Sequence, residues 1–431
     1  MTKRMLLAVL LLIVFALPAG CQKQGGEPTQ PTAPAPTILP TPTPEPSPTP
    51  PPDPVGEALA GMTVEQKAAQ LLVAGIEGTE PGEDAVQAVQ GYQVGGVILF
   101  GRNVESAEQL AALTNGLKEL NGDYTPLFLC VDQEGGRVDR MPPEGSRTPS
   151  AWSVGQTLDT EGVGVSYGEL LAAECAAFGF NMDFAPSLDI WSNPDNTVIG
   201  DRAFGNDWEW TAFFGMSAVE GMEKQGTVIP VVKHFPGHGD TAVDSHTALP
   251  VVDKTLEDLW QSELVPFDMV LSGQFWGEPV MEPTPAVMVA HILLSQIDPD
   301  NPASLSPEVV TGLLREEMGY EGVVCTDDLT MGAISNTYGM GEAAVLAVEA
   351  GCDLLLVCHG ADNLAEAHAA LVEAVDSGCI PEERLDESVY RVLSLKTVYG
   401  LSNAPVEAPD IEALNDRIAA LERSIEADTS Q

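Results

Sequence analysis

The chain is short of positive charge. Its 431 residues include 19 lysines and arginines against 64 aspartates and glutamates, so the formal net charge is −45. Such a charge repels nucleic acid and anionic membrane surfaces, and we therefore exclude nucleic acid as a partner. Since 44% of the residues are apolar, there is ample material for a core, and the acidity belongs to a solvated surface rather than to disorder.

Motifs for metals and dinucleotides are also missing. The chain contains no CxxC and no H-E-x-x-H spacing, so we expect no metal site; no GxGxxG follows the first strand-like segment, so we expect no cofactor. Cys130, Cys325 and Cys358 lie in apolar runs, where cysteine behaves as a small buried hydrophobe. The cysteines indicate no disulfide framework, although an oxidising compartment would permit one or two bridges.

The N-terminus lacks an apolar run long enough to cross a bilayer. Lys3 and Arg4 precede the apolar residues 5–17, which fall short of the roughly 20 needed for a membrane span, and "PAGC" then ends at Cys21. Residues 1–21 are therefore expected to be a secretory signal peptide. The stretch resembles a bacterial lipoprotein signal, which implies a lipid anchor on Cys21, but Pro18 departs from that pattern and leaves secretion without lipid open.

Residues 22–56 are expected to form a proline-rich linker. Thirteen prolines lie between Pro28 and Pro54 among Thr, Ala and Glu, a composition that stiffens into polyproline II and buries no core. At about 3.1 Å per residue such a tether reaches roughly 80 Å. We expect it to hold an extracellular domain away from the cell membrane.

Eight short apolar runs alternate with helical patterns over residues 57–402. Each is continuous in apolar character, as in parallel strands buried on both faces: "QLLVAG", "VGGVILF", "PLFLCVD", "NMDFAPSLDI", "VIPVVKHF", "AVMVAHI", "GVVCTDD" and "DLLLVCHG". Between them, Ser106 with Gln109 predicts a capping box, and Ser306 with Pro307 begins a helix that Gly319 ends. The alternation predicts a (β/α)8 barrel, with an open doubly wound sheet as the competing architecture. Residues 403–431 are expected to form a C-terminal helical tail.

Polar residues follow the apolar runs where the predicted strands end. In a (β/α)8 barrel these ends meet at one face, which carries the active site. The residues expected there are Asp132, Asp183 or Asp189, Lys233 with His234, His291, and Asp327 with Asp328. Any single one of them can be a core residue, but their recurrence at successive strand ends indicates a site.

The segment "KHFPGHGDTAVDSH", residues 233–246, holds three of the six histidines. Its glycines and small residues give the backbone freedom to carry His246 over a bound ligand and away again. For His238 we favour a role in shaping the turn over a role in proton transfer. His359 and His368 receive no role.

Three motifs are similar to those of the glycoside hydrolase family 3 β-N-acetylhexosaminidases. "VDQEGGRVDR" resembles the family's sugar-binding loop after strand three, "KHFPGHGDTAVDSH" its Lys-His segment and catalytic loop, and "CTDDLTMGAI" its nucleophile strand. The resemblance runs from residue 62 to residue 401, nearly the whole expected globular part. It implies a single-domain glycosidase with a carbohydrate substrate.

A retaining glycosidase needs one carboxylate that forms a glycosyl ester and a second group that first donates and then accepts a proton. The resemblance assigns the nucleophile to Asp327 and the acid/base to His246, with Asp244 as its orienting partner. Histidine, whose unperturbed pKa is about 6.5, can give and take a proton near neutral pH. Asp328 is expected to point away from Asp327 and to hold the following turn.

The resemblance also implies sugar-binding roles for five residues. Asp132 would accept hydrogen bonds from two adjacent hydroxyls and Arg140 would donate to the same ring, while Arg202 in "IGDRAFG" matches a further loop of the family. The alternative for each arginine is a salt bridge to the abundant surface acid. Lys233 and His234 are expected to hydrogen-bond sugar hydroxyls rather than to transfer protons.

The leading hypothesis is a retaining exo-β-N-acetylglucosaminidase that acts outside the cell on peptidoglycan fragments or related glycans. Phosphorolysis stays open, because a neutral histidine repels phosphate less than a carboxylate does. A β-glucosidase or β-xylosidase is a further alternative. A glycan-binding lipoprotein without activity is disfavoured, since neither Asp327 nor the pair of Asp244 and His246 is lost. The oligomeric state and the role of the insertion "GQFWGEPVMEPTP", which contains Trp276, stay open.

Overall fold

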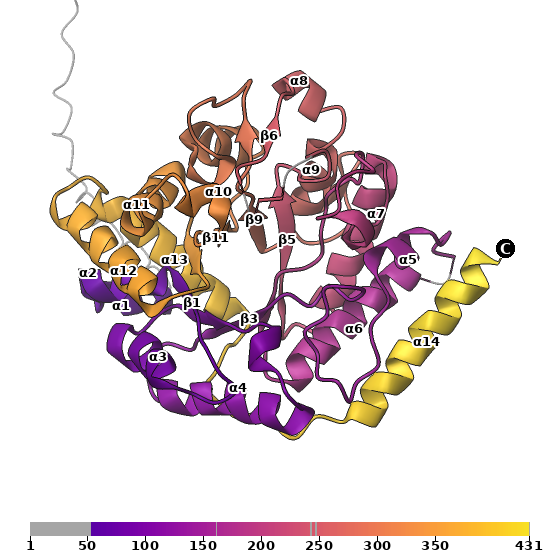
Figure 1. Cartoon of the computed structure of the whole chain (residues 1–431), viewed down its shortest axis with the longest axis horizontal. Coiled ribbons are helices and arrows are strands. Elements are labelled where there is room, and N and C mark those ends of the chain that lie inside the picture. The colour runs from indigo at the N-terminus through magenta and orange to yellow at the C-terminus, as the bar shows by residue number, and fades with distance from the viewer. Residues whose placement is uncertain (1–52, 161, 242–243, 246–247, 431) are drawn as a thin grey trace, which may run out of the picture. The chain divides into compact units, whose positions relative to one another are not determined.

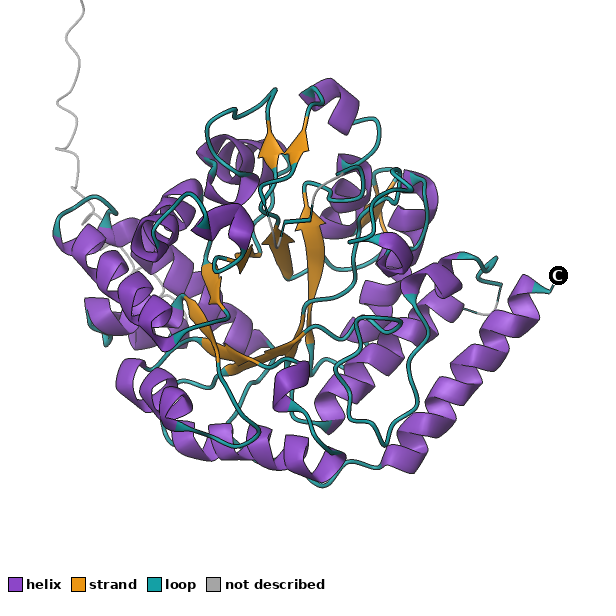
Figure 2. Ribbon diagram, viewed as in Figure 1, coloured by secondary structure: helices purple, strands orange, loops and turns teal. Residues whose placement is uncertain are grey.

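A computed structural model of the chain describes residues 53–160, 162–241, 244–245 and 248–430. Its centre is a closed barrel of parallel strands surrounded by helices (Figures 1 and 2). Each of the eight apolar runs supplies one strand, so the predicted (β/α)8 barrel is confirmed and the open doubly wound sheet is wrong. In barrel order the strands are β1 (Leu72–Gly75), β2 (Gly96–Ile98), β3 (Phe128–Val131), β4 (Met182–Asp183), β5 (Ile229–Phe235), β9 (Ala286–Val289), β11 (Val323–Asp328) and β12 (Leu354–Val357).

Helices cover the outside of the barrel. The α-helices are α1 (Pro54–Ala60), α2 (Val64–Gln70), α3 (Glu83–Val86), α4 (Ala107–Asn121), α5 (Ala151–Gly155), α6 (Val163–Ala177), α7 (Trp208–Glu223), α8 (Leu256–Leu259), α9 (Leu264–Ser272), α10 (Gly332–Ser335), α11 (Met340–Ala350), α12 (Ala361–Asp376), α13 (Glu382–Val398) and α14 (Ile411–Thr429). Among the described helices, none is both long enough and apolar enough to span a bilayer.

Shorter elements complete the chain. Segments η1 (Gln87–Tyr92) and η5 (Glu308–Glu317) are wound as π-helix, and η2 (Gly101–Asn103), η3 (Gly200–Arg202) and η4 (Ala303–Leu305) are 3-10 turns. Two small sheets lie outside the barrel, β6 (Val251–Val252) with β10 (Leu293–Leu294) and β7 (Gln274–Phe275) with β8 (Glu278–Pro279).

Both faces of the barrel strands are buried, as their continuous apolar runs predict. Alternate residues of every strand meet in one cluster, the filled barrel interior, while their neighbours pack against the helices. Cys130, Cys325 and Cys358 belong to the interior cluster, so their interpretation as buried hydrophobes is confirmed. All six cysteines in the described part of the chain are free thiols.

Two helical segments begin at residues that the sequence predicts as N-terminal caps. The Ser106 hydroxyl accepts a hydrogen bond from the Gln109 amide at 3.2 Å, but the Gln109 side chain accepts from the Glu105 amide at 2.8 Å rather than from Ser106. The predicted capping box is therefore correct only in its first half. Ser306 caps the amide three residues on at 3.3 Å, and Gly319, with a φ of 70°, follows the end of η5 as expected.

The C-terminal helix α14 lies along α6 on the outside of the barrel (Figure 1). Leu414, Ile418 and Leu421 form its buried face. Near its start, the Asn415 side chain accepts a hydrogen bond from the Ser146 amide at 2.6 Å. The expected helical tail thus packs on the barrel and touches the long loop that follows β3.

Candidate active site

A cavity of about 230 Å³ lies at the carboxyl ends of the barrel strands. Asp132 directly follows β3, Lys233 and His234 lie near the end of β5, and Asp327 lies near the end of β11. Together with Arg140 and Arg202, which come from loops, these six predicted site residues all line the cavity: Asp132, Arg140, Arg202, Lys233, His234 and Asp327. The barrel topology therefore brings together residues that are almost 200 positions apart in the sequence, from 132 to 327.

Lys233 is the buried cation of the site. Its ammonium lies 2.7 Å from an Asp132 carboxylate oxygen and 2.5 Å from a Glu134 oxygen, and only 1% of its side chain is exposed. Burial alone would lower the pKa of Lys233, but the two carboxylates outweigh it and raise that pKa above its usual value. Lys233 is therefore charged and held in place at neutral pH.

Glu134 joins Lys233 to a second cation. Arg202 binds both Glu134 carboxylate oxygens, from Nε at 2.7 Å and from Nη2 at 2.8 Å, which is the two-pronged geometry that arginine favours with carboxylates. Burial alone would raise the pKa of Glu134, but Arg202 and Lys233 hold it well below its usual value. Glu134 is thus an ionised anion shared by two cations.

The hydrogen bonds of His234 fix its protonation. Its Nδ1 lies 2.5 Å from an Asp189 carboxylate oxygen, and its Nε2 lies 3.1 Å from Nη2 of Arg202. Because a guanidinium can only donate, Nε2 must accept, so His234 is the neutral tautomer that carries its proton on Nδ1. This arrangement makes His234 a fixed part of the site wall with both ring nitrogens engaged, and its expected hydrogen bond to a sugar hydroxyl stays a prediction.

Asp189 anchors the same corner. Its second oxygen accepts a hydrogen bond from the backbone amide of His238 at 2.6 Å, and the Ser187 hydroxyl donates at 2.9 Å to the oxygen that faces His234. Burial would raise the pKa of Asp189, but His234 and the His238 amide hold it well below its usual value. Of the two alternatives in the sequence, Asp189 therefore contacts the cavity wall, whereas Asp183 accepts from the Gln133 amide at 2.8 Å and is completely buried.

Asp327 reaches the cavity from its floor. One carboxylate oxygen accepts from the amide of Asp328 at 2.8 Å, and the side chain is only partly buried. Burial would raise the pKa of Asp327, but the nearby His291 and His234 rings, that amide and the Lys233 ammonium outweigh it and lower the pKa. Asp327 is thus ionised and open to a ligand.

The neighbours of Asp327 have structural partners. Asp328 accepts hydrogen bonds from the Thr330 amide at 2.9 Å and the Cys358 amide at 3.1 Å, so it holds the turn after β11, as expected. His291 is completely buried, with Nδ1 2.7 Å from the Ser304 hydroxyl and Nε2 3.0 Å from the Asp328 carbonyl oxygen. Both ring nitrogens are therefore committed behind the cavity rather than facing it.

Arg140 differs from Arg202 in its contacts. Its backbone amide donates to the Gln133 side chain at 2.8 Å, which fixes the loop after β3. Its Nε is buried without a hydrogen-bond partner among the described residues. Since Arg140 also lines the cavity, it presents donors that a bound ligand would satisfy.

The loop after β5 is described in part. Ser245 lines the cavity, and its carbonyl accepts a hydrogen bond from the Ala333 amide at 3.0 Å, which ties the loop to α10. Asp244 is described and exposed, whereas His246 lies outside the described residues. His238 is buried, with Nδ1 2.8 Å from the Thr241 hydroxyl and Nε2 3.1 Å from that of Ser245, so it shapes this loop as expected.

Several residues that line the cavity received no role from the sequence, among them Glu134, Phe100 and His359. Glu134 is the hub of the ion pairs, and its signal was available, because Asp132 and Glu134 stand two positions apart and share one side of an extended chain. Phe100 and His359 stack at 5.7 Å between ring centroids and form an aromatic part of the wall. No sequence signal pairs these rings, since they are distant in the chain and meet only through barrel closure.

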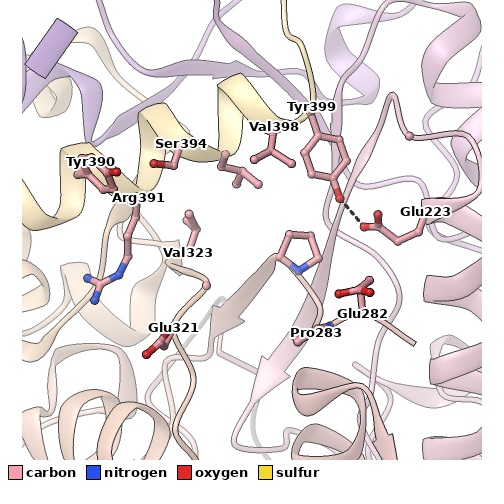
Figure 3. A pocket seen from close by; sticks show the side chains of 14 residues that line it. Glu223, Glu282, Pro283, Glu321, Val323, Tyr390, Arg391, Ser394, Val398 and Tyr399 are labelled. Atoms are coloured by element: carbon pink, nitrogen blue, oxygen red, sulfur yellow. Dashed lines mark hydrogen bonds between the residues drawn. The ribbon is translucent and has the colours of Figure 1, made fainter. Parts of the chain in front are cut away.

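A larger cavity, of about 600 Å³, opens at the opposite end of the barrel (Figure 3). It lies beside Gly226, Pro285 and Gly322, which precede β5, β9 and β11, and α13 forms its other wall. Its lining combines apolar side chains such as Val323 and Val398 with Glu282, Glu321 and Arg391, and Tyr399 donates a hydrogen bond to Glu223. Active sites of such barrels lie at the carboxyl end, so the smaller cavity remains the candidate.

Comparison with known proteins shows the family of the chain. The model of the Glycosyl hydrolase family 3 N terminal domain matches residues 63–395. A β-hexosaminidase of Bordetella avium is 36% identical over 310 residues, covering 70% of this chain and 85% of its own length. The β-hexosaminidase A of Pseudoalteromonas piscicida is 33% identical over 341 residues, and this alignment spans 74% of this chain but only 56% of that protein.

Solved structures show the same relationship. A glycoside hydrolase family 3 β-N-acetylglucosaminidase from a Paenibacillus species is 41% identical, with a TM-score of 0.78, over 84% of this chain and 68% of its own. A β-N-acetylhexosaminidase from Beutenbergia cavernae is 30% identical, with a TM-score of 0.70, over 78% of this chain and 99% of its own. With the family model covering most of the barrel domain, the chain belongs to glycosyl hydrolase family 3 and is a glycoside hydrolase.

Proposed function

We propose that the protein is a retaining exo-β-N-acetylglucosaminidase that releases terminal N-acetylglucosamine from peptidoglycan fragments or related glycans. The observation that carries the proposal is the ionised Asp327 carboxylate on the floor of a cavity walled by fixed charges. At about 230 Å³ the cavity is smaller than the roughly 300–1,000 Å³ usual for ligand pockets, which favours one sugar ring and thus exo action. The names of the β-N-acetylglucosaminidase and β-hexosaminidase relatives support the choice of sugar.

The reaction runs in two displacements. In the first, an Asp327 oxygen bonds to the anomeric carbon, the glycosidic bond breaks, and the leaving oxygen takes a proton from His246. In the second, His246 takes a proton from water, the water oxygen bonds to the anomeric carbon, and Asp327 leaves as a carboxylate. Asp244 orients the imidazole and stabilises its charged form between the two steps.

The remaining site residues bind and orient the sugar. Arg140 supplies donors without a partner among the described residues, and Asp132 supplies a carboxylate that is 20% exposed. Lys233, Arg202 and His234 are already engaged with acids of the site, so they form a preorganised wall whose dipoles need no rearrangement on binding. This division assigns recognition to the first pair and rigidity to the other three.

We further propose that this activity lies outside the cell. We infer that residues 1–21 direct secretion, that Cys21 carries lipid, and that residues 22–56 space the barrel domain, residues 57–402, from the membrane; the proline-rich composition supports the spacer. Fractionation of expressing cells tests the anchor. The full chain should sediment with membranes and a Cys21→Ala variant should be released, whereas equal release of both would leave ordinary secretion.

Replacement of the nucleophile tests the activity. Asp327→Ala should abolish release of nitrophenol from the β-N-acetylglucosaminide, since the proposal assigns the ester to this carboxylate, and full retained activity would remove the proposal. Asp195→Ala, an exposed loop change, is the matched control and should keep full activity. NMR of the first product should show the β-anomer.

A second assay separates hydrolysis from phosphorolysis. The reaction is run in phosphate and in phosphate-free buffer, and a sugar 1-phosphate as the main product would overturn hydrolysis.

For His246→Ala, added azide should restore turnover of an activated aryl glycoside and yield a β-glycosyl azide, because azide attacks the ester without base catalysis. No restoration would remove His246 from the acid/base role.

A further inference from the structure

An exposed aromatic surface lies outside the catalytic cavity. The hairpin of β7 and β8 carries Trp276 in its turn, with 67% of this residue exposed. The Trp208 ring, at the start of α7, lies 5.6 Å from the Trp276 ring at an interplanar angle of 81°, and the Phe275 ring lies 6.1 Å from it. We call Trp208, Phe275 and Trp276 the aromatic platform.

The backbone of Trp276 is unfavourable for so large a side chain. Trp276 has a φ of 53° and Gly277 a φ of 82°, as in the two-residue type I′ turns of hairpins. Asn-Gly and Asp-Gly suit this turn, whereas left-handed backbone is rare for bulky residues. A tryptophan that is strained and also mostly exposed contributes little to the core, so its position points to contact with something outside the fold.

The net charge of the protein limits which kinds of molecule can bind to the aromatic platform. A formal net charge of −45 opposes both an anionic membrane surface and a second copy of the same chain. A neutral glycan experiences neither repulsion. One face of a pyranose ring presents C–H groups that pack on an indole, and the same hairpin carries the exposed polar residues Gln274 and Glu278, whose side chains can hydrogen-bond hydroxyls.

We propose that the aromatic platform is a second glycan-binding site that holds a polymeric chain of β-linked N-acetylglucosamine-type sugars away from the catalytic cavity. None of its residues lines that cavity: Trp208 begins α7, and Phe275 and Trp276 belong to the hairpin between α9 and β9. The platform retains the enzyme on long substrates while the cavity removes one terminal sugar at a time. The sugar class rests on the proposed function.

The turn itself supplies a discriminating variant. Trp276→Asn replaces the ring by a residue that suits left-handed backbone, so the fold should keep or raise its melting temperature while the platform is lost. In the full chain with Asp327→Ala, retention on insoluble chitin and affinity for N-acetylchitohexaose should fall at least about fivefold on adding Trp276→Asn, a loss typical of one aromatic contact. Trp210→Asn, on the exposed face of α7 and stacked on Phe214, is the matched control and should retain binding.

Aryl glycoside hydrolysis by Trp276→Asn in the otherwise unchanged chain separates the two proposals. Unchanged small-substrate activity with weaker chitin retention supports the platform, while absent activity in the parent chain rejects the proposed function instead. Equal chitin binding by both variants overturns the platform. A fall in the melting temperature of Trp276→Asn without a change in chitin binding also overturns the platform, because it assigns Trp276 to packing within the fold. A dimer that sedimentation detects and that Trp276→Asn dissociates overturns it as well, because it assigns Trp276 to contact with a second copy.

Discussion

Two buried lysines stand at opposite ends of the barrel and behave in opposite ways. Lys233, at the carboxyl end, has the carboxylates of Asp132 and Glu134 as partners, and its pKa is raised although burial works against it. Lys396, on α13, donates to the Gln70 side chain at 2.9 Å and the Gly95 carbonyl at 2.8 Å. With only neutral partners, burial lowers the pKa of Lys396 to about 7.

The difference between the two lysines shows that a buried charge with oppositely charged partners, rather than a buried charge alone, indicates a binding site. At the carboxyl end each buried cation has an anion, so the charges are fixed and present a preorganised wall to the cavity. At the amino end Lys396 lies over the Phe128 ring at 4.7 Å, beneath the packed barrel interior, and the neighbouring large cavity is lined by apolar residues together with three glutamates and Arg391 (Figure 3). Cavity size alone favours the amino end, whereas the opposed charges at the strand ends favour the carboxyl end, the face that carries the active site in such barrels.

The largest effect is expected from replacing Lys233, the buried cation whose charge is balanced by two carboxylates. Lys233→Met leaves Asp132 and part of the Glu134 charge without a counter-ion, and breaking a buried pair in this way costs about 3–5 kcal/mol. The variant should lose that much free energy of unfolding in urea and should lose activity on the aryl glycoside. Lys224→Met, whose lysine is 47% exposed, should change neither measurably. A stable, active Lys233→Met variant would contradict the ionic wall.

The fold and the membership of the site could be predicted from the sequence for a physical reason. Strands buried on both faces are continuous in apolar character, and a barrel gathers the residues that follow them at one face. Asp132, Lys233, His234 and Asp327 therefore met where expected, as did the loop arginines Arg140 and Arg202 that the family motifs supplied.

The partners within the site could not be predicted in the same way. Lys233 bonds Asp132 across 101 positions and Arg202 bonds Glu134 across 68, and such pairings depend on which side chains the closed barrel brings within reach. Lys396 shows the same limit, because an amphipathic helix pattern does not reveal that one lysine points into the barrel floor. The strain of Trp276 is also invisible in sequence, since it arises from the hairpin register.

A second test of the difference between Lys233 and Lys396 measures how the free energy of unfolding changes with pH. Because the folded-state pKa of Lys396 is depressed to about 7, from 10.5, the unfolded chain binds the extra proton between these values, so stability rises with pH across that window. Below about pH 7 the full penalty of the buried charge is present. Lys396→Met removes the proton and therefore the slope.

Urea unfolding of wild type and Lys396→Met between pH 7 and pH 10 measures this effect. The wild type should gain on the variant by up to about 1.4 kcal/mol per pH unit, the limit for one proton. Lys67→Met, on a lysine whose pKa is raised by paired acids, is the control and should show no such gain. Parallel stability curves for wild type and Lys396→Met would place an unrecognised anion near Lys396.

The smallest expected effect concerns a buried acid with neutral partners, the counterpart of Lys396 beside the active site. Glu174 of α6 accepts from the Thr148 hydroxyl at 2.8 Å and from the Gln133 side chain at 2.9 Å, and Gln133 in turn fixes the Arg140 amide. Burial raises the pKa of Glu174 to about 8, with Asp139 raising it further and Arg417 of α14 opposing. Since the folded-state pKa lies above the unfolded value, the stability it contributes is complete below about pH 4.5 and declines as pH rises towards 8.

Glu174→Gln imitates the neutral acid, because an amide can donate to the Thr148 hydroxyl and accept from Gln133. At pH 6 its kcat/KM should stay within about twofold of wild type, or roughly 0.4 kcal/mol. Its unfolding free energy should lose the decline that wild type shows between about pH 5 and pH 8. Glu174→Ala, which frees the loop that carries Arg140, should instead raise KM at every pH. If Glu174→Gln and Glu174→Ala raise KM equally, Glu174 acts as a charge rather than as a neutral hydrogen-bonding brace, and the parallel with Lys396 fails.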